Sequence, residues 1–129
     1  MTRREEAEHL LTRSKEFLET AEYQIGKGFY GLAVFSLEQA LQLFLKSKML
    51  MSGIDYPRTH GVRALLELLS ELALEDEKAS INRVLDTYLL ELGVLEDAYI
   101  TSRYVTREFR REDAQRLMIA VKEVMKNVA

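Results

Sequence analysis

The sequence contains no cysteine and no tryptophan, and it has one proline, six glycines and two histidines in 129 residues. Without cysteine the chain has no disulfide, no thiolate metal ligand and no cysteine nucleophile, which fits a reducing compartment. No stretch approaches the ~18 uncharged apolar residues that a membrane span needs. The N-terminus also lacks the apolar run of a signal peptide. We therefore expect a cytoplasmic protein with no membrane segment.

The scarcity of proline and glycine leaves few places where the chain can be divided. There is no internal repeat, no low-complexity stretch and no linker in the sequence. A domain of this length buries roughly two-thirds of the surface that its unfolded chain exposes, which allows one core. Residues 1–129 therefore predict a single domain.

Charge is unevenly distributed along the chain, whose formal net charge is -3. Residues 103–129 hold seven Lys and Arg against four Asp and Glu, whereas residues 1–102 hold eleven against seventeen. This distribution excludes a uniformly basic surface of the kind that coats nucleic acid, but it leaves room for a local basic patch near the C-terminus.

Apolar residues recur at spacings of three and four throughout the chain, which predicts helices, and no window alternates strictly as a strand does. The predicted fold is all-α, an up-and-down bundle of four long helices plus a short one. The first helix ends near Gly26–Gly28, because glycine favours helix C-caps. The others are predicted over 30–51, about 60–73, 75–104 with a weak point at Gly93, and 111–128.

The helix over residues 30–51 has the clearest pattern. Glu38, Gln42 and Lys46 fall opposite its apolar stripe and are predicted to face away from the core. The apolar stripe itself consists of Tyr30, Ala33, Val34, Leu37, Ala40, Leu41, Phe44 and Leu45, with Lys48 at its end.

A wide apolar face on the helix over 75–104 suggests a homodimer. Leu89, Leu90 and Val94 lie off its main stripe, so the face is wider than one core requires. The alternative is that a central helix of a bundle is buried on several sides.

Histidine and glycine patterns favour neither a metal nor a bound cofactor. His9 and His60 have no second histidine three or four residues away, and Glu6 and His9 form only one copy of a Glu-x-x-His frame. A di-metal bundle site needs two such frames and two further glutamates. The segment 26–28, Gly-Lys-Gly, is too short for a phosphate-binding loop.

Residues 99–111 are the most unusual segment, with four arginines and three aromatic residues in thirteen positions. Arginine binds phosphate or carboxylate bidentately, and aromatic rings stack on bases. The alternative is that Tyr99 and Tyr104 complete the core while the arginines stabilise a helix end.

A second cluster, Arg58, His60 and Arg63, lies at a predicted helix N-terminus, where an anion is favoured. The alternative there is a local cap at the turn.

The sequence as a whole resembles the HEPN family, small helical bundles found in prokaryotes beside minimal nucleotidyltransferases. The resemblance covers nearly the whole chain. It rests on 21–23 (Ala-Glu-Tyr), 31–40 (Gly-Leu-Ala-Val-Phe-Ser-Leu-Glu-Gln-Ala) continuing to Lys46, 57–60 (Pro-Arg-Thr-His), and 99–104 (Tyr-Ile-Thr-Ser-Arg-Tyr) with the closing helix from Arg111. No single segment is specific, but their order and spacing together are.

The resemblance implies a bundle that commonly dimerises, and many members are metal-independent ribonucleases or toxins with an Arg-x(4–6)-His motif. Arg103 stands where the motif's arginine is expected, yet no histidine follows it. Arg4 and His9 have the nominal spacing, but they lie in the first helix. Metal-free RNA cleavage needs a proton acceptor and a proton donor with pKa values near neutrality. Arginine is a poor proton carrier, and an unperturbed tyrosine, with a pKa near ~10, is a weak one.

We therefore expect a non-catalytic HEPN subunit of a toxin–antitoxin-like module that binds a nucleotide, RNA or a nucleotidyltransferase partner, as a homodimer. The alternatives are a ribonuclease toxin with an atypical site at Arg103 and Tyr104, and a purely structural dimer. No catalytic residue, metal or cofactor is assigned. The candidate nucleotide- or RNA-binding residues are Arg58, His60, Arg63, Tyr99, Arg103, Tyr104 and Arg107.

Overall fold

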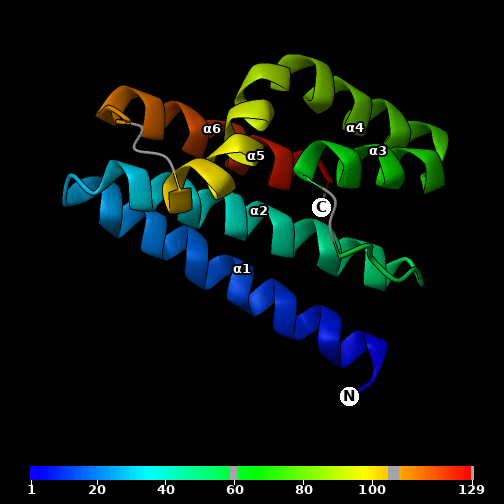
Figure 1. The fold of residues 1–129 in the computed structure, drawn as a ribbon. Helices are drawn as coiled ribbons and strands as arrows, with labels where there is room; N and C mark the ends of the chain where they lie inside the picture. Colours follow the sequence, from blue (N-terminus) through cyan, green and yellow to red (C-terminus); the bar gives the residue numbers. More distant parts are fainter. Residues whose placement is uncertain (59–60, 105–107, 129) are drawn as a thin grey trace.

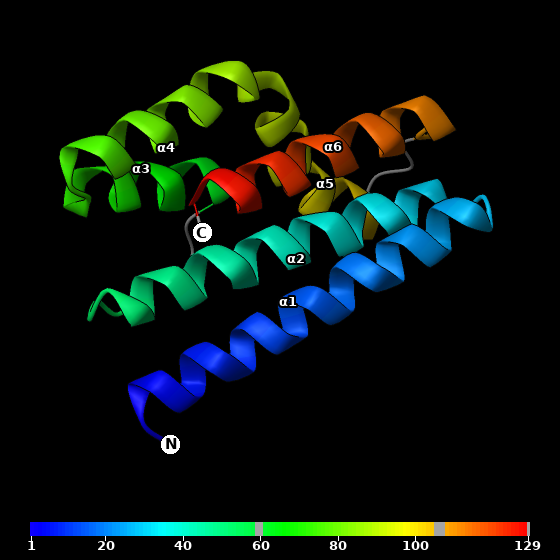
Figure 2. The same cartoon turned by 180° about the vertical axis from the view of Figure 1, so that it is seen from behind.

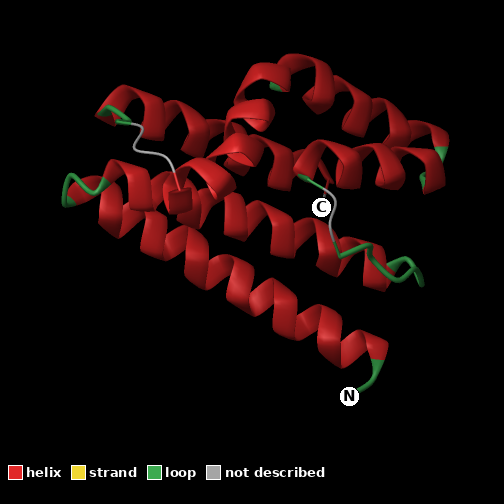
Figure 3. Ribbon diagram, viewed as in Figure 1, coloured by secondary structure: helices red, strands yellow, loops and turns green. Residues whose placement is uncertain are grey.

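The computed structural model describes residues 1–58, 61–104 and 108–128, without the side chains of residues 99–104. These ranges contain six α-helices and no strand, which confirms the predicted all-α fold (Figures 1 and 3). None of the helices in these ranges is long and apolar enough to cross a membrane. The helices are α1 (Arg3–Gly26), α2 (Tyr30–Met51), α3 (Val62–Leu72), α4 (Glu75–Thr87), α5 (Leu89–Tyr104) and α6 (Arg111–Val128).

The central helix is α2, which lies between α1 and α6 in both views of the ribbon (Figures 1 and 2). It also contacts α3 and α5. Helices therefore cover α2 on several sides, and its apolar residues form the middle of the core. The largest fully buried side chains of the protein are Leu37, Leu41, Leu45, Met49, Leu65, Leu66, Leu92, Leu95, Val34, Val62, Val121 and Val124.

Small residues line the contact between α1 and α2. On α1 they are Ala7, Ser14 and Ala21, and on α2 they are Ala33, Ala40 and Ser47, so that successive members are seven positions apart. The Ser14 hydroxyl donates to the Ala40 carbonyl at 2.6 Å, and the Ser47 hydroxyl donates to the Ala7 carbonyl at 2.8 Å. These two bonds set an antiparallel register in which small side chains face each other, so the two backbones approach closely. We call these six residues the small-residue seam.

Local signals explain where α1 begins and where the chain turns into α2. Thr2 and Glu5 form a capping box, in which the Glu5 amide donates to the Thr2 hydroxyl at 3.1 Å. After α1 ends, Gly28 adopts a φ of 81°, a conformation that side chains other than glycine rarely adopt. This turn reverses the chain, so that α2 runs back along α1. The predicted bounds of α2 and α6 are confirmed.

The single long helix predicted over residues 75–104 is wrong, and so is the count of four long helices plus a short one. The helix breaks at Tyr88, which ends α4 with φ -112° and ψ 25°, and its carbonyl accepts from the Leu92 amide at 2.8 Å in the first turn of α5. Gly93, the predicted weak point, lies inside α5. At 1.5 Å per residue an unbroken helix would be about 45 Å long, well beyond the about 33 Å of α2. The break lets α4 pack on α3 and α6 while α5 turns back onto α2 (Figure 1).

The small-residue seam predicts that added volume there destabilises the fold. Ala40→Leu should lower the free energy of unfolding by about 1–3 kcal/mol, because α1 and α2 must move apart to hold the extra carbons. Ala79→Leu, the same change at an exposed position of α4, is the control and should change it by less than about 0.5 kcal/mol. Chemical denaturation of both variants measures the difference. Equal effects at the two positions would show that α1 and α2 are not closely packed.

Candidate functional site

A carboxylate from α5 caps the N-terminus of α3. One oxygen of Glu96 accepts from the Arg63 backbone amide at 2.8 Å, and the other accepts from Nε and Nη2 of the Arg63 side chain at 3.1 and 2.9 Å. Gly61, the residue before α3, has no side chain that can cap the helix. The hydrogen bonds that Arg63 donates to Glu96, and the negative charge of Glu96, raise the pKa of Arg63. Glu96 therefore joins α3 to α5 by three hydrogen bonds.

Gly61 is required for this contact because Glu96 lies against its backbone. A Cβ at position 61 would come within 2.7 Å of Cδ and 2.8 Å of Oε1 of Glu96. Any other residue would therefore displace the carboxylate from the start of α3. The position of the Glu96 carboxylate therefore depends on having glycine at position 61.

Glu38, near the middle of α2, is a second carboxylate close to this contact, and it is only 2% exposed. Its two oxygens accept from the side-chain amides of Gln39 and Gln42, each at 2.7 Å. The Gln42 carbonyl in turn accepts from Lys46 Nζ at 3.0 Å. Gln42 therefore links the buried carboxylate to a partly buried ammonium group. The prediction that Glu38 faces away from the core is wrong, because α2 has helices on several sides.

Burial changes the proton affinity of this polar group. Desolvation raises the pKa of Glu38, opposed by the hydrogen bonds from Gln39 and Gln42 and by the positive charge of Lys46. The negative charge of Glu96 raises it further, so the two carboxylates are close enough to repel each other. Burial lowers the pKa of Lys46. We refer to Glu38, Gln42, Lys46, Glu96 and Arg63 as the polar cluster.

The connector between α2 and α3 is held against α1 and α2. Lys46 Nζ lies 5.1 Å from the centre of the Tyr56 ring, and the Tyr56 hydroxyl donates to Glu6 at 3.0 Å. Arg3 and Asp55 pair at 2.9 Å. Burial, and then the bond to Glu6, raise the pKa of Tyr56. These contacts place the connector, with Arg58 near its end, alongside the polar cluster.

The polar cluster joins one predicted binding segment to the helix that carries part of the other. Arg63 is bonded to Glu96, which lies one helical turn before Tyr99 in α5. Arg58 is exposed and is not hydrogen-bonded or ion-paired to any residue that the structure describes. Tyr99, Arg103 and Tyr104 belong to α5, but their side chains lie outside the described part, as do His60 and Arg107 altogether. The predicted binding roles of these residues stay predictions.

Sequence reasoning missed Glu38 and Glu96. Both are acids spaced as helix surface residues are, so their polarity alone suggested exposure. For Glu38 the available signal was its sequence neighbours. Gln39 and Gln42 lie within about one turn of it in a helix that is otherwise mostly apolar, so partners for a buried carboxylate were close in the sequence. For Glu96 the signal was the absence of a capping side chain at Gly61, which called for a partner from elsewhere in the fold.

Two hollows flank Phe109 near the starts of α2 and α6. One, of about 220 Å³, lies between α5 and α6 and is lined by Leu90, Glu91, Val94, Phe109, Asp113, Arg116 and Leu117. The other borders the start of α2 and is lined by Gly28, Phe29, Tyr30, Gly31, Leu32, Glu108 and Phe109. Arg111 Nε donates to the Tyr30 hydroxyl at 3.2 Å and ties α6 to α2 beside them. Apolar surface is thus accessible at this end of the molecule.

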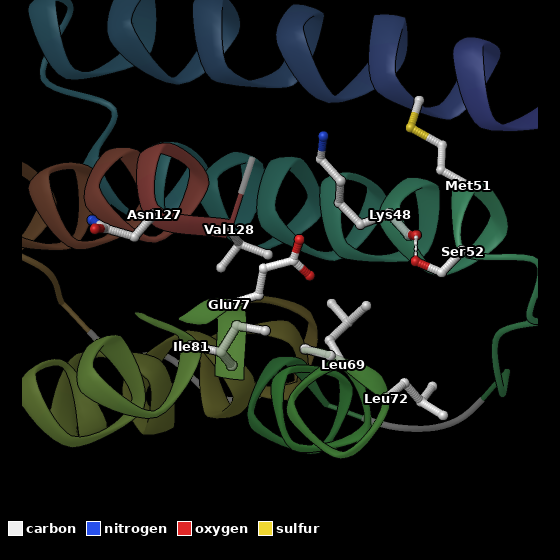
Figure 4. Close-up of a pocket in the computed structure, with 10 residues that line it drawn as sticks. Lys48, Met51, Ser52, Leu69, Leu72, Glu77, Ile81, Asn127 and Val128 are labelled. Atoms are coloured by element: carbon white, nitrogen blue, oxygen red, sulfur yellow. Dashed lines mark hydrogen bonds between the residues drawn. The ribbon is translucent and has the colours of Figure 1, made fainter. Parts of the chain in front are cut away.

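A further hollow, of about 270 Å³, lies among the ends of α2 and α6 and the α3–α4 pair (Figure 4). Its floor includes Leu69, Ile81 and Val128, and the Glu77 carboxylate points into it. Lys48 extends away from Glu77 in this view, and its Nζ lies 5.2 Å from the centre of the Phe44 ring. Arg58 and Arg63, the predicted binding residues whose side chains the structure describes, do not line this hollow. Within the described ranges, no three His, Asp or Glu side chains are grouped so that they could hold a metal ion.

Comparison with known proteins places the chain in one family. The family model described as the HEPN domain matches residues 7–129. The fold is similar to the crystal structure of TT1696 from Thermus thermophilus, with a TM-score of 0.73 over 99% of this chain and 97% of that chain. The two sequences are 22% identical, so this similarity concerns the fold alone. No match was found among curated protein sequences.

The contact between Gly61 and Glu96 predicts energetic coupling of the two positions. Gly61→Ala should destabilise the native chain by about 1–3 kcal/mol, because the new methyl group displaces the carboxylate that caps α3. In a Glu96→Ala background the same change should cost less by at least about 0.5 kcal/mol, since nothing remains to be displaced. A double-mutant cycle by chemical denaturation measures this coupling. Additive effects would show that Glu96 does not lie against Gly61.

The raised pKa of Glu38 predicts a specific pH dependence of stability. Above the ordinary value of 4.5, the native state retains the Glu38 proton to a higher pH than the unfolded chain does. The native state therefore binds more protons in this window, so stability falls as pH rises from 4.5 through the raised pKa. The free energy of unfolding of the native chain should fall relative to that of Glu38→Gln over this range.

Denaturation curves at several pH values provide the measurement. Glu67→Gln, at an exposed position of α3, controls for the loss of one negative charge. The prediction is contradicted if the difference in free energy of unfolding between the native chain and Glu38→Gln stays constant with pH. It is also contradicted if the native chain becomes more stable relative to Glu38→Gln as pH rises.

Proposed function

The chain belongs to the HEPN domain family, and on that premise we propose that it is a non-catalytic HEPN subunit that binds the phosphate groups of RNA or a nucleotide. The proposed binding surface lies where the start of α3 meets the C-terminal half of α5. It combines Arg58, Arg63, Arg103 and Arg107 with the aromatic residues of α5 and with His60.

The contact between Arg63 and Glu96 is the observation that carries this proposal. It brings the start of α3 against α5, so two segments that are far apart in the sequence, each rich in arginine, approach one place. Arg103 comes seven residues, or two helical turns, after Glu96 in α5. Arg58 is exposed at the end of the connector and has no described partner, so a phosphate group can reach its guanidinium.

The chemistry of the same residues supports binding rather than cleavage. The Arg63 guanidinium is already bonded to Glu96, and both oxygens of Glu38 accept amide hydrogen bonds. No histidine follows Arg103 in the sequence, so the family's Arg-x(4–6)-His motif is incomplete. Arginine stabilises negative charge, but it does not exchange protons near neutral pH.

One observation favours a second function, a metal-independent ribonuclease with an atypical site at Arg103 and Tyr104. Glu38 is a buried carboxyl with a raised pKa close to Glu96, and perturbed acids of this kind are found at catalytic sites. The amides of Gln39 and Gln42 satisfy both oxygens of Glu38, so its burial needs no catalytic explanation. Binding without cleavage therefore remains our proposal, with a nucleotidyltransferase as the alternative occupant of the same surface.

Binding of a fluorescently labelled single-stranded RNA, followed by anisotropy at several salt concentrations, tests the proposal. Arg58→Ala and Arg103→Ala should each weaken binding and reduce the slope of log K against log salt by about 0.7–1, the loss of one phosphate contact. Arg13→Ala removes the same charge from an exposed position of α1 and is the control. It should leave the slope unchanged.

The intact RNA must also be recovered after incubation. Cleavage by the purified protein that disappears in Arg103→Ala, while the fold is retained, would establish the ribonuclease instead. Failure to bind RNA or nucleotides, together with co-purification of a nucleotidyltransferase that Arg58→Ala releases, would assign the surface to that partner. A purely structural role predicts that Arg103→Ala changes only the melting temperature.

A further inference from the structure

We propose that the hollow among the ends of α2 and α6 and the α3–α4 pair is a docking site for a basic amphipathic helix of another protein. This site is separate from the proposed phosphate-binding surface, because Arg58 and Arg63 do not line the hollow. Three features of the same place support it: an apolar floor, exposed apolar residues on the rim, and an excess of acids beside them.

The floor of the hollow is apolar and has room for aliphatic side chains (Figure 4). Leu69 and Ile81, which form part of the floor, are only 6% and 4% exposed, so the core holds them in place. The volume of about 270 Å³ is enough for at least one large aliphatic side chain, since an apolar cavity of about 150 Å³ holds a benzene molecule. The hollow can therefore receive a side chain from another molecule without rearrangement of the core.

Two large apolar side chains on the rim of the hollow reach solvent. Met51, the last residue of α2, is 50% exposed, and Leu72, the last residue of α3, is 52% exposed. Methionine is flexible and polarizable, and it is common on surfaces that bind partner helices. The rim thus extends the apolar surface of the hollow outward, where a partner can contact it.

Acidic residues are in excess at the turn between α3 and α4. Residues 69–77 hold four acids and no base, and the carboxylate of Glu77 points into the hollow (Figure 4). Even when Lys48 of the lining and Lys78 are included, acids outnumber bases by four to two. The four acids are exposed and form no ion pair with a residue of the described ranges; they are Glu71, Glu75, Asp76 and Glu77.

Helix electrostatics within the chain explain only some of these acids. Glu75, Asp76 and Glu77 lie in the first turn of α4, where the macrodipole favours negative charge. Glu71 lies in the last turn of α3, where the macrodipole disfavours negative charge and no base is present in the turn. A cationic partner at the hollow would remove this unfavourable interaction.

Charge and secondary structure together indicate the occupant. The acidic rim repels a second copy of the chain, the phosphates of nucleic acid and an anionic membrane. The described ranges contain no strand to which an extended peptide could add, and no aromatic residue of these ranges lines the hollow to receive a proline-rich peptide. The mode of recognition that fits is a helix whose apolar face enters the hollow while its lysines or arginines meet the acids.

Fluorescence anisotropy of a labelled model peptide tests the proposal. The peptide consists of about 18 leucines and lysines, with the leucines three and four positions apart so that they share one helix face. A peptide of the same composition, with its leucines distributed evenly around the helix, is the control. The native chain should bind the patterned peptide at least about tenfold more tightly, because only its leucines can contact the floor and the rim together.

Substitutions on the rim test where the peptide binds. Leu72→Lys should weaken binding at least about tenfold, because it replaces an apolar contact by a charge that repels the peptide. Leu32→Lys makes the same change at a 57% exposed leucine that does not line the hollow, and it should have no effect. Glu77→Gln should weaken binding and lower its salt dependence, whereas Glu16→Gln removes the same charge from an exposed position of α1 and should do neither.

The methyl resonances in an NMR titration give an independent readout. The patterned peptide should shift those of Leu69, Ile81 and Val128 and leave those of Leu117, between α5 and α6, in place. Because Leu72 is half exposed, Leu72→Lys should keep its helical circular dichroism and melt cooperatively, which separates loss of binding from loss of the fold.

Equal binding of the two peptides overturns the proposal, as does equal binding of the patterned peptide by the native chain and Leu72→Lys. Shifts at Leu117 without shifts at Leu69 and Ile81 would also overturn it. Leu72→Lys retains Arg58 and Arg63, so it should bind RNA as the native chain does. The peptide and RNA measurements can therefore fail independently of each other.

Discussion

The close antiparallel packing of α1 on α2 is the constraint on which the rest of the structure depends. Small residues on both helices let the backbones approach, and the serine hydroxyls at positions 14 and 47 fix the register by bonding to carbonyl groups of the opposite helix. The larger apolar residues of α2 then remain for α3, α5 and α6, which pack around its other sides. A helix surrounded in this way has no fully solvated face, so its polar residues must find partners inside the protein. Glu38 finds them in two neighbouring amides of α2.

At Glu96, one carboxylate serves two purposes. It satisfies a backbone amide at the start of α3 and holds the side chain of Arg63, and its position depends on the glycine beside it. The structural role accounts for Arg63 without any ligand, whereas the exposed Arg58 has no such role among the described contacts. Membership of the HEPN family is shown by the match over residues 7–129.

Sequence reasoning succeeded where a local signal decides the structure and failed where the decision is tertiary. The ends of α2 follow from the glycine turn before it and from Ser52 and Gly53 after it, and α6 follows from the helical spacing of its apolar residues. The break at Tyr88 has no proline or glycine to mark it. It serves a tertiary arrangement, since α4 packs on α3 and α6 whereas α5 packs on α2. Glu38 was assigned to the wrong face for a similar reason, since helical periodicity describes one apolar side and α2 has several. The two candidate segments were proposed from sequence separately, but the contact through Glu96 that brings the start of α3 to α5 depends on the fold.

Because α3 is capped from α5, a property of α3 depends on the position of α5. In an ordinary helix start the amide of the second residue bonds to its own capping side chain, so its exchange with solvent deuterium depends on that helix alone. Here the Arg63 amide bonds to a side chain of α5. Its exchange rate therefore depends on the position of α5. A shift of α5 that breaks this hydrogen bond should speed the exchange of the Arg63 amide, thirty-three positions before Glu96 in the chain.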